Sequence, residues 1–220
     1  MSKYKTKILL ILCLGVVSCS NESGTAHEAD GSAEKLSSSS STKVLGNGPF
    51  GIDAGTQLAD LSTSGERDAE TGVSILKSAP KASTQFPEVA VISYPFTGVC
   101  EIRSVSSVFE SDAFIASSSA FVDEVASALK AKYGDVDLDD KCSGYSCRSE
   151  YKLQAIEDGS RWYGYTWKNS DKIKLPNRLS EINLYITHSE FNNSVVRLDY
   201  VFDNTAICSE SAKKAKASAL

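Results

Sequence analysis

Three segments near the C-terminus alternate strictly between apolar and polar residues, and this alternation constrains the fold more than any other feature. The segments are residues 161–168, 181–188 and 195–203. Successive side chains of a β-strand point to opposite faces, so a period of two places the apolar set on one side. A polar set on the other side is typical of an antiparallel sheet that is covered on one face only. We therefore predict such a sheet, with helices packed against its apolar face.

An amphipathic helix is predicted to cover that face. Over residues 118–133, Phe121, Val125 and Leu129 recur at every fourth position, and Gly134 follows. This spacing is typical of the buried face of a helix, and glycine is the residue most often found just after a helix end. Residues 150–157 predict a second, shorter helix.

The first half of the chain predicts further strands. Residues 72–77, 89–94 and 99–108 are rich in Val and Ile, which favour the half-buried surface of a sheet. The expected fold class is therefore α+β, an antiparallel sheet with helices packed on one face.

The order of the elements gives the two halves a loose similarity, each with a helix followed by strands. Residues 50–61 contain Gly-Thr-Gln-Leu at positions 55–58. This stretch resembles the opening of the repeats in small periplasmic helix–sheet proteins, such as the β-lactamase-inhibitor and outer-membrane-assembly lipoprotein folds. The resemblance implies two tandem helix–sheet repeats, and it concerns the fold alone.

The N-terminus has the features of a secretory leader. Three lysines precede an apolar run over residues 8–17, which is shorter than the ~20 residues needed to cross a bilayer and has the length of a signal-peptide core. Residues 16–19 read Val-Val-Ser-Cys. This resembles the lipobox of bacterial lipoproteins, in which the leader is removed before the cysteine and lipid is attached to it. The resemblance implies a signal peptide over residues 1–18 and a lipidated Cys19 that carries diacylglycerol and an amide-linked acyl chain such as palmitate. It also implies attachment to the bacterial envelope, with the outer membrane as the expected location. An uncleaved anchor and plain secretion are the alternatives.

The rest of the chain divides by composition. Residues 19–47 are rich in Ser and predict a flexible tether, residues 48–209 one globular domain, and residues 210–220 a disordered basic tail. The leader holds three of the 23 basic residues and none of the 28 acidic ones, so its removal changes the net charge from −5 to −8. This charge argues against a nucleic-acid partner, because phosphate backbones bind basic surfaces.

Four cysteines remain for the domain once Cys13 leaves with the leader and Cys19 carries lipid. An even number of cysteines in an oxidising compartment predicts that they form disulfides. The short spacing from Cys142 to Cys147 allows a tight turn to bring the two together, which leaves Cys100 to pair with Cys208.

Two further features have a chemical interpretation. The acidic residues 135–140 allow an irregular calcium site, although they lack the glycine and glutamate of an EF-hand loop; an acidic solvated turn is the alternative. His188 is the only histidine of the predicted domain, so a Ser-His-Asp triad of a hydrolase would have to be built on it; a hydrogen-bonded histidine at a strand end is the alternative. No cofactor is expected.

The polar face of the predicted sheet is the best candidate for a binding surface. Alternation places Trp162 and Tyr185 there, together with Val195 and Val201, and aromatic residues on a rigid surface are frequent at protein interfaces. The alternative is that the helix over residues 150–157 or the first-half strands cover this face. The leading hypothesis is a lipoprotein that binds an envelope protein or wall component without catalysis, as an inhibitor or in assembly. The rivals are a small hydrolase that uses His188, and a structural spacer or surface antigen.

Overall fold

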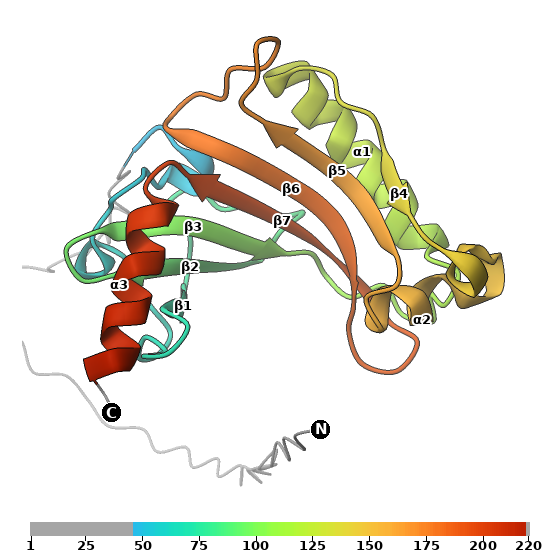
Figure 1. The fold of residues 1–220 in the computed structure, drawn as a ribbon, viewed down its shortest axis with the longest axis horizontal. Helices are drawn as coiled ribbons and strands as arrows, with labels where there is room; N and C mark the ends of the chain where they lie inside the picture. The colour runs from blue at the N-terminus through green and yellow to red at the C-terminus, as the bar shows by residue number, and fades with distance from the viewer. Residues whose placement is uncertain (1–45, 219–220) are drawn as a thin grey trace, which may run out of the picture. The chain divides into compact units, whose positions relative to one another are not determined.

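Seven strands form one antiparallel sheet (Figure 1). Their order across the sheet is β1-β2-β3-β7-β6-β5-β4. The structure, a computed structural model, describes residues 46–218. The strands are β1 (Val73–Ile75), β2 (Glu88–Tyr94), β3 (Gly98–Val105), β4 (Asp139–Lys141), β5 (Trp162–Lys168), β6 (Leu179–His188) and β7 (Ser194–Phe202). The helices are α1 (Ala116–Tyr133), α2 (Lys152–Glu157) and α3 (Thr205–Ser218). The predicted α+β fold class is thus confirmed. The predicted signal peptide, the lipidation site Cys19 and most of the tether lie outside the described residues.

The sheet joins the two halves of the chain at its centre. Strand β3 of the first half pairs with β7 of the second, with Ile102 opposite Tyr200 and Ser104 opposite Leu198. On β7 the residues at even positions from Val196 to Phe202 are buried, as the alternation predicted. Long β6 pairs with β7 along nearly all of its length, so the C-terminal meander forms the most extensive part of the sheet.

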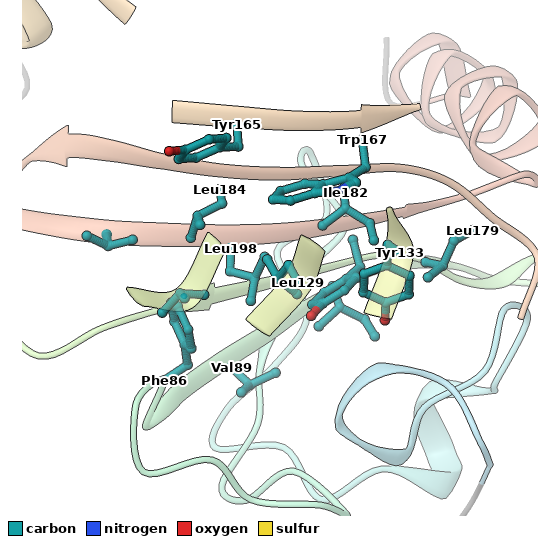
Figure 2. Packing of buried hydrophobic residues seen from close by; sticks show 14 of the residues in the cluster. Phe86, Val89, Leu129, Tyr133, Tyr165, Trp167, Leu179, Ile182, Leu184 and Leu198 are labelled. Carbon is teal, nitrogen blue, oxygen red and sulfur yellow. The ribbon is translucent and has the colours of Figure 1, made fainter. Parts of the chain in front are cut away.

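Helix α1 packs its apolar stripe on this sheet. Val122, Val125 and Leu129 are buried in the core, and Figure 2 shows Leu129 and Tyr133 beside Ile182 and Leu198. The indole Nε1 of the buried Trp167 donates a hydrogen bond of 2.8 Å to the carbonyl oxygen of Gly134. This contact fixes the C-terminal end of α1 to strand β5.

A buried carboxylate, Asp112, fixes the other end of α1. Its oxygens accept hydrogen bonds from the backbone amides of Ser117 and Ser118 and from the hydroxyls of Ser118 and Ser194. The first amides of a helix have no partner within the helix, so a carboxylate at this position acts as a cap. Because Ser194 begins β7, Asp112 also ties the start of α1 to the sheet.

The structure corrects the prediction of a disordered tail over residues 210–220. Residues 205–218 form α3, which packs on β2 and β3 on the opposite side of the sheet from α1 (Figure 1). Thr205 anchors its first turn by donating a hydrogen bond to the carbonyl oxygen of Phe202. The Ala, Lys and Glu residues that suggested a solvated tail also have high helix propensity, and a buried Cys208 holds this helix on the sheet.

The first half of the domain contains less helix than the predicted repeat requires. Over residues 46–61 the chain forms only two short 3-10 turns, Pro49–Gly51 and Leu58–Asp60. The second half carries both α1 and α2. The tandem repeat therefore stays a prediction.

Candidate functional site

Trp162 and Tyr185 lie on the same face of the sheet and stack on one another. Their ring centroids are 4.6 Å apart and the ring planes are inclined by 26°. Gly164 pairs with Tyr185 in the register of β5 and β6, and a Cβ atom at position 164 would lie 2.7 Å from the Cβ of Tyr185. A side chain at position 164 would therefore collide with the backbone of β6. A glycine within a strand often marks such a close approach.

Arg197 and Asp199 of the neighbouring strand hold the tyrosine of this pair. The guanidinium carbon of Arg197 lies 5.5 Å from the Tyr185 ring centroid, within range of a cation–π contact. The Tyr185 hydroxyl donates a hydrogen bond of 2.9 Å to Asp199, and Arg197 Nη2 lies 3.2 Å from both carboxylate oxygens. Burial raises the pKa of Asp199, although the charge of Arg197 opposes that effect.

A polar ladder continues across the same face. The register aligns Thr166, Asn183, Asp199 and Arg103 across four adjacent strands. The Thr166 hydroxyl donates to the Asn183 side-chain oxygen at 2.9 Å, and the Arg103 side chain donates to Glu101 at 2.5 Å. Two acidic and two basic groups pair on this face, Arg103 with Glu101 and Arg197 with Asp199, so their charges balance. We call this surface, formed by Trp162, Tyr185, Arg197 and the ladder, the aromatic face.

Neither of the elements that could have covered the aromatic face does so. Strands β1 to β3 extend the sheet edge to edge with β7 and do not lie on top of it. The buried residue Leu153 of α2 joins the same core cluster as the α1 residues. Helix α3 packs on β2 and β3, so among the described residues no helix covers the aromatic face over β5 and β6 (Figure 1). Of the two valines predicted there, Val201 is half-buried and Val195 is buried.

His188 lies at the end of β6 in a pocket of about 270 Å³, beside α2 and the β6–β7 turn. Its Nε2 atom lies 2.6 Å from the carbonyl oxygen of Phe191 and 3.8 Å from a carboxylate oxygen of Glu157. The residues that line the pocket include no serine, threonine or cysteine. The histidine thus has a carboxylate neighbour there but no side-chain nucleophile among the lining residues.

The acidic stretch over residues 135–140 supplies ion pairs within the protein. Asp140 receives two hydrogen bonds from Arg161, at 2.8 and 2.6 Å, and Asp139 pairs with Lys141. The Arg161 side chain is 4% exposed, and its other terminal nitrogen donates to the carbonyl oxygen of Ser146. Within the described residues no group of three or more His, Cys, Asp or Glu side chains is placed to hold a metal ion.

Two cysteine pairs have Cα separations typical of disulfides, and they are the two pairs that the sequence predicted. The Cα atoms of Cys100 and Cys208 are 6.5 Å apart, and those of Cys142 and Cys147 are 5.2 Å apart. Both separations lie within the range of protein disulfides. The first pair connects α3 to β3, and the second closes a short turn before α2.

Comparison of the chain with protein-family models, with curated proteins and with solved structures finds no match. Over residues 46–218, no helix has the length and apolar character needed to cross a membrane.

Proposed function

We propose that this chain is a lipoprotein of the bacterial cell envelope. In this proposal Cys19 carries the lipid, the Ser-rich tether holds the acidic domain away from the membrane, and the aromatic face binds an envelope protein or wall component without catalysis, as an inhibitor or in assembly. The leader sequence supports the location. The stacked pair of Trp162 and Tyr185 supports the binding role.

The composition of the aromatic face favours a protein partner. Trp, Tyr and Arg are the residues that most often contribute large binding energies at protein interfaces, and here all three are in contact. Their side chains are already held by neighbours, so little conformational entropy is lost when a partner binds. The balanced charges of the ladder suit a mixed polar surface rather than a polyanion.

The experiment is affinity capture from native envelopes with the tagged full chain. Replacing both Trp162 and Tyr185 with alanine should weaken capture of a specific partner about thirtyfold or more, because a hot-spot residue contributes about 2 kcal/mol. The matched control replaces Tyr145 and Tyr151, an exposed aromatic pair near α2 with ring centroids 6.1 Å apart. The control should retain the partner.

The captured material also identifies the class of partner. A protein that is lost only from the Trp162 and Tyr185 variant supports the proposal, and so does loss of binding to purified wall sacculi in that variant alone. Retention of every partner by this variant would refute the binding role and would favour a spacer or surface antigen.

The pocket at His188 supports a second candidate, a small envelope hydrolase. Its basis is the proximity of His188 to Glu157, a pair that could act as a general base. If this candidate is right, His188→Ala should abolish a hydrolytic activity of the purified chain towards ester, amide or glycoside substrates. Activity that survives the substitution would remove the candidate.

A further inference from the structure

A second cavity, of about 350 Å³, lies between α1 and residues 81–86, above the core side of β7. It is on the opposite side of the sheet from the aromatic face, because α1 forms one wall and Leu198 and Tyr200 form the floor. Its volume is at the lower end of the ~300–1,000 Å³ that is usual for small-molecule sites. We call it the α1 pocket.

The floor and walls of the α1 pocket are mainly apolar. Phe50 lies edge-on to Tyr200, with ring centroids 6.1 Å apart. Phe86 packs on Phe121 of α1, with centroids 5.7 Å apart, which holds the 81–86 segment against the helix. Leu129 contributes the opposite wall. An apolar chain could therefore bury part of its surface against these side chains.

The charged side chains among the lining residues are both lysines, Lys81 and Lys132. Neither forms an ion pair in the described part of the chain. The Nζ atom of Lys132 lies 5.0 Å from the centroid of the Tyr133 ring. In a chain whose acidic residues outnumber the basic ones, two unpaired ammonium groups at one pocket indicate a site for an anion.

Two carboxylates approach the α1 pocket, and both are engaged by the protein. Glu124 accepts a hydrogen bond of 3.0 Å from the side-chain amide of Gln85, and Asp53 accepts one of 2.8 Å from the backbone amide of Gly48. Neither carboxylate is among the lining residues. The lysines therefore remain available to an anion from outside the chain.

A polar group also lacks a partner at the floor of the α1 pocket. Tyr200 lines the pocket and is 7% exposed, and none of the hydrogen bonds within residues 46–218 involves its hydroxyl. The hydroxyl oxygen is not fully buried, so it is available to a polar atom of a ligand in the pocket.

We infer that the α1 pocket binds a small anionic amphiphile, a molecule with one acidic head group and an unbranched apolar body such as a medium-chain fatty acid. The apolar body lies over Phe50, Leu129 and Leu198, and the head group lies between Lys81 and Lys132. This site is separate from the aromatic face and does not depend on the function proposed for that face.

The test uses the tagged full chain in its own membranes, with decanoate that carries a photoreactive diazirine in its chain. After irradiation, peptide mapping should place the label on residues 47–50, 81–86 or 125–132. Unlabelled decanoate should compete, whereas decanol and decyltrimethylammonium should compete about fivefold less well, because they lack the negative charge. Labelling spread over unrelated peptides, or equal competition by decanol, would overturn the inference.

Variants separate the head-group contact from the apolar one. Replacing Lys81 and Lys132 with glutamine should lower decanoate labelling about fivefold or more, as expected from the loss of two partly exposed ion pairs. The control double variant, Lys77→Gln with Lys130→Gln, removes the same charge from positions outside the pocket and should label normally. Ala128→Trp places a large ring in the pocket from α1 and should abolish labelling by acid and alcohol probes alike. Normal labelling of the Lys81 and Lys132 variant, or of Ala128→Trp, would overturn the inference.

Discussion

At the scale of single residues, Asp112 is the most connected polar side chain of the domain. One carboxylate oxygen accepts hydrogen bonds from the Ser118 amide, the Ser118 hydroxyl and the Ser194 hydroxyl, and the other accepts from the Ser117 amide. Burial disfavours the charged form, but these four hydrogen bonds outweigh it and lower the pKa of Asp112. The charged carboxylate therefore stabilises the native state.

We expect Asp112→Asn to lower the free energy of unfolding at neutral pH by about 2 kcal/mol, because an amide places N–H groups where the site offers only donors. Urea denaturation followed by circular dichroism measures this change. Glu110→Gln, an exposed position two residues earlier, removes the same charge and should leave stability within about 0.5 kcal/mol of the wild type.

The pH dependence gives an independent check on Asp112. A carboxyl group whose pKa is lower in the folded than in the unfolded state stabilises the protein above its unfolded pKa, which is about 3.9. That contribution is lost as the pH falls through the folded pKa. The difference between wild type and Asp112→Asn should therefore be full at pH 7 and should shrink below about pH 4. A constant difference across this range would contradict the assignment.

The Arg161 guanidinium is the second residue-scale feature with a measurable consequence. Its partner Asp140 belongs to the acidic stretch that suggested calcium, so Asp140→Asn tests both interpretations. We expect a loss of about 1–3 kcal/mol, since the substitution leaves a buried charge without its counter-ion. Millimolar calcium should not change the melting temperature of the wild-type chain. A rise in melting temperature that Asp140→Asn abolishes would instead support a calcium site.

At the scale of elements, the strands and α1 could be predicted because their residue pattern carries the information. The observed strands β5, β6 and β7 lie within two residues of the predicted segments, and α1 begins two residues before residue 118. Burial of one face requires apolar residues at regular positions, so the period of the sequence predicts which side chains the structure buries.

Helix α3 and strand β4 were missed for physical reasons that differ. Residues 205–218 contain few large apolar residues, and α3 is held on the sheet by Thr205, Cys208 and Ala212. The predicted pairing of Cys208 with Cys100 was the one signal that the chain returns to the sheet there. Strand β4 has only three residues, all charged, and it forms through backbone pairing with β5 and the pairing of Asp140 with Arg161. Such tertiary contacts leave no periodicity in the sequence.

The candidate sites were predictable to different degrees. Alternation placed Trp162 and Tyr185 on one face, but the cation–π contact of Arg197 depends on the register between β6 and β7, which the sequence does not specify. The α1 pocket joins residues 47–50, 81–86 and 125–132 with β7. Because these segments are far apart in the chain, no local pattern points to their common cavity.

The two disulfides should contribute unequally to stability. The chain-entropy model relates the contribution to the number of residues between the cysteines. A separation of 108 residues for Cys100 and Cys208, against 5 for Cys142 and Cys147, gives about 5 and about 2 kcal/mol respectively. Replacing each pair with alanine and measuring urea denaturation tests this order.

Hydrogen exchange locates the effect of the first disulfide. In the variant without Cys100 and Cys208, the amides of α3 should lose protection, because the helix packs on β2 and β3 beside this disulfide. The protection of α1 amides should still match the free energy of global unfolding of the variant. Unchanged protection of α3 would show that packing alone holds the helix.

At the scale of the whole molecule, the sheet separates two surfaces of different character. The aromatic face carries Trp162, Tyr185 and a charge-balanced ladder, and the opposite side carries α1 and a pocket with two unpaired lysines. A large partner could thus contact the aromatic face while a small amphiphile occupies the α1 pocket. Attachment to a membrane would bring both surfaces close to envelope proteins and to lipids, so the anchor is the proposal on which the location of both depends.

The proposed anchor predicts a difference between two cysteines of the leader region. If the lipobox resemblance is correct, Cys19→Ala should block incorporation of labelled palmitate and release the chain from the membrane fraction. A protein with at most one acyl chain binds a bilayer only marginally. Cys13→Ala is the matched control: Cys13 lies in the apolar run that is removed, so this variant should be labelled normally.

Mature wild-type protein should also show no free thiol until it is reduced, since its other four cysteines are paired. Palmitate labelling that persists in Cys19→Ala, or that disappears in Cys13→Ala, would exclude Cys19 as the lipid attachment site and leave an uncleaved or secreted chain as the account of this N-terminus.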